Sequence, residues 1–197
     1  MRNTADGKCW SLEPSIVCDT FPEDPVNRYI NGDHKWKIVL KCKLNEVQKG
    51  DACVLSILPS YIALDIHKEN FFFTITYEDD STEYDILPID IYNGQRISIT
   101  YEHTPKQNFS VFINNEEMIN FDLTKKGIKS GVNSCVVIGS NTFISDHLSK
   151  PADLDLYEFK VYINDILECN HDFKNIIFNK SFDKTGNLNF LHTYNEE

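Results

Sequence analysis

The chain has 197 residues, of which 41% are hydrophobic, and this is enough to bury the core of a single domain. Thirty acidic side chains outnumber 19 basic ones, which gives a formal net charge of −11. Because affinity for nucleic acids rests largely on lysines and arginines that neutralise phosphates, this charge argues against DNA or RNA as a partner.

The N-terminal segment, residues 1–33, shows neither the pattern of a signal peptide nor a regular alternation. Its first ten residues, MRNTADGKCW, lack the apolar core of a secretion signal, and no run of 18 apolar residues occurs in the chain. We therefore expect no secretion signal and no membrane partner. Pro14, Pro22 and Pro25 interrupt this segment, so we expect an extended arm with room for one short strand.

From residue 34 onward, apolar and polar residues alternate with the period of two that marks half-buried β-strands. In KWKIVLKCKL, Trp36, Ile38 and Leu40 alternate with lysines, and we expect the lysines to face solvent. Further strands are predicted in ACVLSIL, YIALDIH and NFFFTITYE, the last followed by an acidic turn and the short strand YDIL. This last pair predicts a hairpin with an acidic tip.

The stretch RISITYEHTPKQNFSVFINNEEM, residues 96–118, predicts a meander of antiparallel strands. Its alternation breaks at a polar turn that contains Pro105, resumes in NFSVFI, and breaks again at two asparagines. A buried run, CVVIG, and a long strand in DLDLYEFKVYINDIL follow. With about ten to twelve strands and hardly any helix, the predicted fold class is all-β, an antiparallel β-sandwich or jelly roll.

The sequence divides into an N-terminal arm at 1–33, the sandwich at 34–169 and a C-terminal segment at 170–197. Apolar side chains on the two ends must be buried on this sandwich or on a neighbouring protein. We predict that these ends, not a cleft, carry the principal interaction, with packing on the chain's own sandwich as the alternative. The interaction residues predicted in this way are Trp10, Leu12, Ile16, Phe21, Phe173, Phe178 and Phe182.

The order of these pieces resembles the laminin-G-like, concanavalin A-like jelly-roll domains. The similar elements are a strand that ends in Thr100–Tyr101, a following Val-x-x-Asn at 111–114, the stretch VVIGSN, and a closing Tyr-x-x-x-Val-Tyr at 157–162. The resemblance covers residues 34–169 and implies a jelly-roll sandwich of the kind found in bacteriophage virion proteins. It implies little about function.

One element departs from the family's order. FDKTGNLNF, residues 182–190, resembles an Asp-x-Ser/Thr-Gly-Asn element that stands before the first sandwich strands in many such domains, yet here it lies near the C-terminus. It is an independent turn, the sign of a permuted chain, or a tail copied from a neighbouring module. In physical terms it is a turn, because Gly186 and Asn187 tolerate positive φ.

The sequence predicts no cofactor. Six cysteines at irregular spacing, without a Cys-x-x-Cys pair and without a leader, favour free thiols over a disulfide framework. The six histidines stand singly, so no zinc site is expected. Calcium is left open, because calcium-binding laminin-G-like domains use a rim aspartate and Asp146, Asp153 and Asp155 lie near one loop. Solvated loop acids are the alternative.

The sequence also predicts no enzymatic activity. Glu83 and Asp85 share one strand face, as the two carboxylates of a glycoside hydrolase would. The hydrolase pattern continues with a third acidic residue, whereas Ile86, Leu87 and Pro88 follow here. Gly-x-Ser-x-Gly and phosphate-binding glycine loops are absent from the sequence.

Three functions remain, in this order. The first is a structural protein of a bacteriophage virion (capsid decoration, head-fibre or tail protein), located in the virion, with other virion proteins or copies of itself as partners. The alternative is a carbohydrate-binding, lectin-like module for host-surface glycans, with Phe72, Tyr92 or Tyr162 as aromatic platforms. A glycoside hydrolase comes last.

Overall fold

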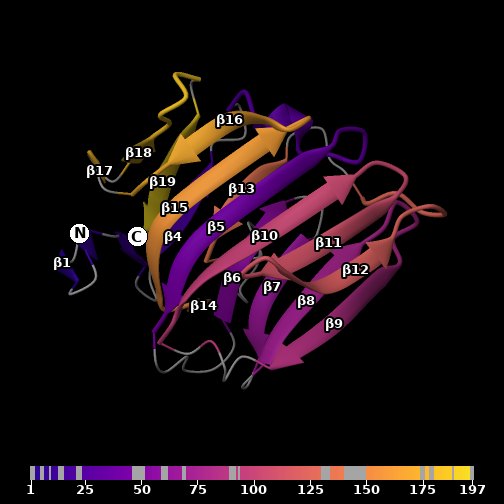
Figure 1. Ribbon diagram of the computed structural model, residues 1–197, viewed down its shortest axis with the longest axis horizontal. Coiled ribbons are helices and arrows are strands. Elements are labelled where there is room, and N and C mark those ends of the chain that lie inside the picture. The colour runs from indigo at the N-terminus through magenta and orange to yellow at the C-terminus, as the bar shows by residue number, and fades with distance from the viewer. Residues whose placement is uncertain are drawn as a thin grey trace.

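The computed structural model describes the backbone of most of the chain, and side chains mainly between residues 24 and 173. The residues described are 3–4, 7–8, 10–12, 16–20, 24–45, 52–58, 62–67, 70–88, 92, 94–129, 134–139, 150–173, 176–177, 180–187 and 189–195. They form two sheets that pack face to face around one hydrophobic core (Figure 1). The predicted antiparallel β-sandwich is therefore confirmed.

The first sheet, in front in Figure 1, has seven strands in the order β12-β11-β10-β5-β15-β16, with β3 also paired to β15. All of its pairs are antiparallel. The strands are β3 (Trp10–Leu12), β5 (Trp36–Leu44), β10 (Arg96–Thr104), β11 (Asn108–Ile113), β12 (Glu116–Asp122), β15 (Leu154–Ile163) and β16 (Ile166–His171).

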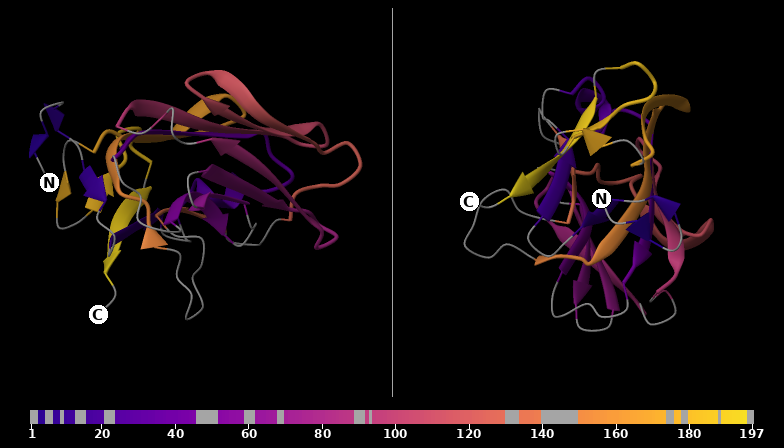
Figure 2. Two further views of the ribbon diagram at one scale, coloured as in Figure 1. Left: turned by 90° about the horizontal axis from the view of Figure 1, so that it is seen from below. Right: turned by 90° about the vertical axis from the view of Figure 1, so that its left-hand side faces the viewer.

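The second sheet lies behind the first and has the order β17-β18-β19-β4-β13-β6-β7-β8-β9; Figure 2 gives side views of the two layers. Its strands are β4 (Ile16–Thr20), β6 (Ala52–Leu58), β7 (Ile62–His67), β8 (Asn70–Thr76), β9 (Thr82–Pro88), β13 (Cys135–Ile138), β17 (Ile176–Ile177), β18 (Lys180–Phe182) and β19 (Phe190–Asn195). The short strand β14 (Lys150–Pro151) pairs in parallel with β6, and β1 (Asn3–Thr4) forms a separate hairpin with β2 (Gly7–Lys8).

The described part of the chain has a 3-10 turn at Asn27–Tyr29 (η1), and Tyr92 is also in 3-10 conformation. No described helix is long and apolar enough to cross a membrane.

A layer of aromatic rings joins the two sheets. Phe73 of β8 packs on three rings of the first sheet, with centroid distances of 5.6 Å to Tyr101, 5.6 Å to Phe109 and 5.7 Å to Phe121. The Tyr101 hydroxyl donates a hydrogen bond across the core to the Leu55 carbonyl of β6 (3.2 Å), so the buried phenol is satisfied. These rings are part of the one hydrophobic core whose burial holds the layers together.

The strands predicted by alternation lie where the pattern indicated. The 96–118 meander is present as β10, β11 and the start of β12, and its turns have positive φ at Lys106, Asn114 and Asn115. β8 and β9 form the predicted hairpin. Cys42, Cys53, Cys135 and Cys169 are buried free thiols.

The N-terminal segment differs from the predicted arm with one short strand, because it contains four strands. β3 pairs with β15, matching Leu12 to Leu154, and β4 lies inside the second sheet between β13 and β19. Pro14 falls between β3 and β4, and Pro22 follows β4, so the prolines separate strands without interrupting them. Strands from both ends of the chain, outside residues 34–169, thus take part in the sheets.

The C-terminal element FDKTGNLNF forms the turn between β18 and β19. Asp183 accepts hydrogen bonds from the backbone N–H groups of Asn170 (2.8 Å) and Thr185 (2.9 Å), from the Thr185 hydroxyl (2.7 Å), and from Asn189 Nδ2 (2.7 Å). Asn189 Oδ1 in turn accepts from the Val26 N–H (3.1 Å), while Gly186 takes positive φ. We call residues 183–187 and 189 the Asp183 turn. Its hydrogen bonds connect the N-terminal segment, at Val26, and the C-terminal segment to β16.

Candidate ligand-binding site

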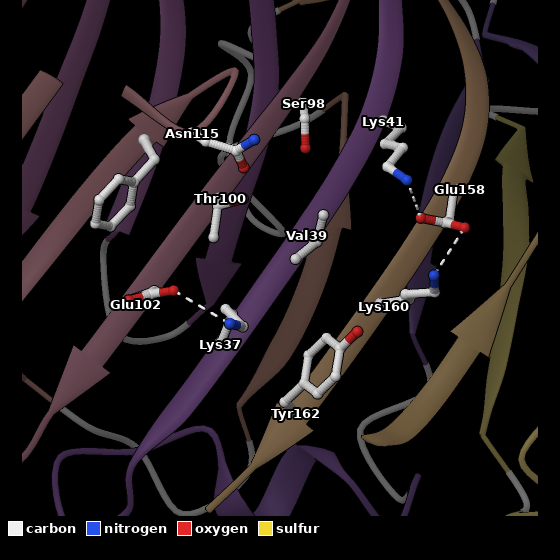
Figure 3. Close-up of a pocket in the computed structure, with 11 residues that line it drawn as sticks. Lys37, Val39, Lys41, Ser98, Thr100, Glu102, Asn115, Glu158, Lys160 and Tyr162 are labelled. Carbon is white, nitrogen blue, oxygen red and sulfur yellow. Dashed lines mark ion pairs between the residues drawn. The ribbon is translucent and has the colours of Figure 1, made fainter. Parts of the chain in front are cut away.

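A shallow groove of about 380 Å³ lies on the outer face of the first sheet (Figure 3). Strands β5, β10 and β15 form its floor, and β11 with the turn after it forms one side. Its lining residues are Lys37, Val39, Lys41, Ser98, Thr100, Glu102, Phe112, Asn115, Glu158, Lys160 and Tyr162.

Strand register arranges these side chains in three rows across the sheet. The central row runs through Phe112, Thr100, Val39 and Lys160. At about 4.8 Å between strands, these four positions span about 14 Å.

The outer two rows flank the central one. One row contains Glu102, Lys37 and Tyr162. The other contains Ser98, Lys41 and Glu158. The two aromatic rings of the groove therefore stand on opposite sides of a polar floor.

A β-bulge in β15 decides which of its residues reach the groove. The register with β5 shifts between Leu156 and Glu158, so that Tyr157 is the extra residue. Leu156 before the bulge and Phe159 after it are both fully buried, which strict alternation would forbid. The shift turns Glu158, Lys160 and Tyr162 outward. Tyr157 itself is half-buried, and the Arg96 guanidinium lies over its ring at 4.2 Å.

The Asn114–Asn115 turn is fixed to β10. The Asn114 N–H donates to the Ser98 carbonyl (2.9 Å), and Asn114 Oδ1 accepts from the Ser98 N–H (3.0 Å). These two bonds hold Asn115 at the rim of the groove.

Glu158 is the centre of the charge network. Lys41 Nζ lies 2.8 Å from its Oε1, and Lys160 Nζ lies 2.8 Å from its Oε2. Burial raises the pKa of the Glu158 carboxyl, but the bonds from Lys160 and Lys41 outweigh it, so that the pKa lies below its ordinary value. Glu158 is therefore ionised at neutral pH, whereas a catalytic acid needs a raised pKa.

Lys37 connects the second carboxylate to the aromatic side of the groove. Its Nζ lies 3.3 Å from Glu102 Oε1 and 5.3 Å from the centroid of the Tyr162 ring. A cation at this distance from a tyrosine ring is attracted by the negative ring face. Aromatic surface, hydroxyl and amide groups, and paired charges thus line one site, which suits binding of a polar ligand with some apolar surface.

The three aromatic residues predicted as sugar platforms lie apart. Tyr162 lines the groove. Phe72 lies on the second sheet, where its ring stacks on Tyr84 at 5.0 Å. Tyr92 is only 8% exposed and packs on Phe71, so the prediction that it is a surface platform is wrong. Phe112 was missed, although alternation in NFSVFI turns it away from buried Val111.

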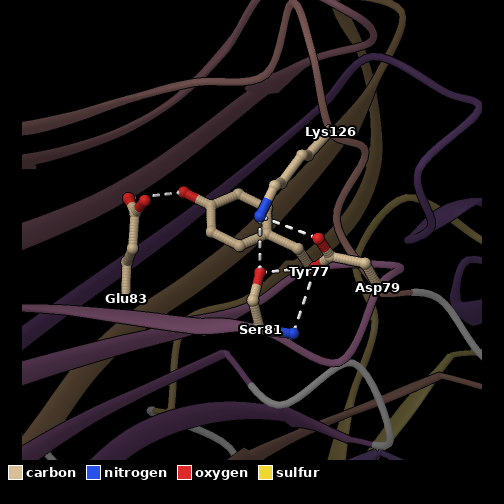
Figure 4. A network of polar contacts seen from close by, with 5 residues as sticks. All are labelled: Tyr77, Asp79, Ser81, Glu83 and Lys126. Atoms are coloured by element: carbon tan, nitrogen blue, oxygen red, sulfur yellow. Dashed lines mark hydrogen bonds and ion pairs between the residues drawn. The ribbon is translucent and has the colours of Figure 1, made fainter.

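The Glu83–Asp85 pair occupies an exposed edge strand, β9. Glu83 accepts a hydrogen bond from the Tyr77 hydroxyl (2.7 Å), and Lys126 bonds Ser81 Oγ (2.9 Å) and Asp79 Oδ2 (2.7 Å) at the adjoining hairpin turn (Figure 4). The contacts of Lys126 and Ser81 lower the pKa of Asp79 to about 2. Asp79 and Asp80 thus lie at the tip of a hairpin, as predicted, and Glu83 and Asp85 lie beside it on β9.

Two of the three aspartates considered for calcium binding, Asp153 and Asp155, are among the described residues. Asp146 lies outside the described residues, and Asp153 Oδ1 accepts from Asn45 Nδ2 (2.9 Å). Asp155 is buried in β15. Among the described side chains, no group of three or more potential metal ligands comes together.

The predicted interaction residues are placed unevenly. Phe173 is fully buried in this chain's own core, near the His171 ring. The others are described by backbone alone or not at all: Trp10 and Leu12 in β3, Ile16 in β4, Phe182 in β18, and Phe21 and Phe178 outside the described residues.

Comparison with known proteins places the fold among sandwich-type binding domains. No protein-family model and no curated protein matches the chain. Among solved structures, the binding domain of Paraclostridial Mosquitocidal Protein 1 aligns with a TM-score of 0.60 at 14% identity, over 82% of this chain and 41% of that one. The ligand-binding domain of botulinum neurotoxin serotype D, solved with N-acetylneuraminic acid, aligns with a TM-score of 0.57 at 12% identity, over 79% and 39%.

A Bacteroides ovatus protein, provisionally named as carbohydrate-binding, aligns with a TM-score of 0.66 at 10% identity, over 96% of this chain and 60% of that one. This chain therefore spans roughly two to three fifths of the length of these proteins. At such low identities the similarity establishes a shared fold.

Proposed function

We propose that this protein is a glycan-binding module and that the groove on the first sheet is its binding site. The observation that carries the proposal is the groove itself, where Phe112 and Tyr162 flank a floor of hydroxyl, amide and charged groups. A sugar ring has apolar C–H patches that suit an aromatic face and hydroxyls that suit such polar groups.

The similar folds support a binding role. One is named as the binding domain of a mosquitocidal protein, one as the ligand-binding domain of a neurotoxin in complex with N-acetylneuraminic acid, and the third is provisionally named for carbohydrate binding. The lowered pKa of Glu158 also favours binding over hydrolysis, since no proton is held there for a leaving group.

The virion role that the sequence predicted gains no support from these similarities. It stays a prediction, together with the location in a virion, and mass spectrometry of purified phage particles from the native source would test it. A glycan-binding module on a virion surface would combine the virion role with the glycan-binding role.

The test is a glycan array probed with the purified chain, followed by calorimetric titration of the best ligand. Tyr162→Ala is expected to weaken binding about tenfold, because it removes one aromatic wall of the groove. Tyr84→Ala is the matched control, since Tyr84 is a 64% exposed aromatic residue on the other sheet. An array without signal, or a loss that follows Tyr84 and not Tyr162, would refute the proposal.

A further inference from the structure

The charge inside the groove differs in sign from that of the whole chain. Three lysines, Lys37, Lys41 and Lys160, face two glutamates, Glu102 and Glu158, which leaves one net positive charge. The chain as a whole carries −11.

The surplus positive charge lies on the two lysines that contact Glu158. One carboxylate lies between two ammonium groups, each 2.8 Å from a different oxygen. Lys41 and Lys160 have side-chain exposures of 50% and 22%, so both can still be reached by solvent. Since an ammonium group has three donors, each lysine has capacity for an acceptor besides Glu158.

Screening by salt limits how far the chain's net negative charge acts on the groove. At physiological ionic strength the Debye length is about 8 Å, so acidic groups farther away than this are largely screened. A ligand anion in contact with Lys41 and Lys160 interacts mainly with these two groups and with Glu158. At contact distance, two ammonium groups against one carboxylate leave a net attraction.

From this charge arrangement we propose that the groove selects glycans that carry an anionic group, a carboxylate or a sulfate, which binds at Lys41 and Lys160. The proposal rests on the glycan-binding function above and names its substrate class. The Tyr162 and Phe112 rings contact the sugar rings, and the anionic group lies toward the Lys41 and Lys160 side of the floor. Neutral glycans of the same shape bind more weakly, because the charge-assisted contacts are lost.

A matched pair of arrays tests the selectivity. One array presents neutral, carboxylated and sulfated glycans, and its duplicate is treated so that every carboxylate becomes a neutral methyl amide. Binding to carboxylated glycans that falls at least tenfold after amidation, or binding confined to sulfated glycans, supports the proposal and distinguishes the two anions. Equal binding to native and amidated or neutral glycans overturns it while leaving the glycan-binding function intact. An absence of signal on both arrays overturns both.

Three variants then locate the anion site, measured by calorimetry with the strongest acidic ligand and its amide. Lys160→Gln is expected to weaken binding of the acidic ligand about three- to tenfold and to leave the amide unaffected. Glu158→Gln is expected to strengthen binding of the acidic ligand, because the two lysines lose their internal counter-ion. Lys125→Gln removes the same charge from an exposed loop residue outside the groove and serves as the control. An equal effect of Lys160→Gln and Lys125→Gln would refute this location.

Discussion

Glu158 is half-buried and His171 is fully buried, and their surroundings favour the charged form of the first and the neutral form of the second. At Glu158 two lysine contacts overcome the cost of burial and keep the carboxylate ionised. At His171, which is fully buried, burial lowers the pKa to about 4 although Asp183 and Asp172 act to raise it. The imidazole is therefore neutral in the folded protein at pH 7.

We expect the protein to lose stability on mild acidification because of His171. In the unfolded chain its pKa is about 6.5, so below that pH the unfolded state binds a proton that the folded state refuses until about pH 4. The free energy of unfolding should fall by about 2 kcal/mol between pH 7 and pH 5 from this group alone. Burial of His103 lowers its pKa and acts in the same direction.

Urea unfolding at pH 7, 6 and 5 measures this change. His171→Phe should flatten the pH dependence, because a phenyl ring has no group that can bind a proton. A slope that His171→Phe does not change would contradict the assignment.

At the scale of elements, a short polar turn joins segments that are distant in the sequence. The Asp183 turn joins β18 to β19, and it also receives Val26 and the β16 backbone through hydrogen bonds. A carboxylate that accepts four such bonds is costly to remove, since its donors are left without a partner.

Asp183→Ala should therefore lower the free energy of unfolding by about 2–4 kcal/mol. Asp165→Asn is the control: it removes the charge of an exposed acid whose surface ion pair with Lys35 is worth at most about 1 kcal/mol, and asparagine tolerates the positive φ at this position. Chemical denaturation of both variants measures this difference. Comparable losses of unfolding free energy in the two would show that the Asp183 turn does not stabilise the fold.

At the scale of the whole molecule, the two ends of the chain belong to the sandwich. β4 lies between β13 and β19, so it connects the C-terminal strands β17, β18 and β19 to the rest of the second sheet. β3 is paired to β15 over three residues. An arm that completes its own sheet has less of its surface available to tether a neighbour.

Truncation of the N-terminus distinguishes strands that the sandwich needs from an arm that is free to bind a neighbour. Deletion of residues 1–12 removes β1 to β3 and should lower the melting temperature by only a few degrees, whereas deletion of residues 1–20 also removes β4 and should lower it by about 10 °C or more. Thermal melts followed by circular dichroism provide the comparison. If a chain that begins at residue 21 has the same melting temperature as the full chain, the N-terminal segment is a free arm.

The sequence by itself determined the local structure and much of the orientation of side chains. A period of two is a property of the extended backbone, so Trp36, Ile38 and Leu40 could be assigned to the core and Lys37 and Lys41 to the surface without knowledge of any neighbour. The hairpin and meander turns followed from adjacent residues for the same reason.

Only the tertiary structure decided which strands are neighbours, and the groove depends on that. Phe112, Thr100, Val39 and Lys160 form one row because β11, β10, β5 and β15 are adjacent in this order, although they come from distant parts of the chain. Alternation fixes a face but not a partner, and it cannot foresee a bulge such as that at Tyr157, which brings Leu156 before it and Phe159 after it to the same buried face. The burial of Tyr92 and the position of β4 were decided in the same way, by long-range packing that no local pattern encodes.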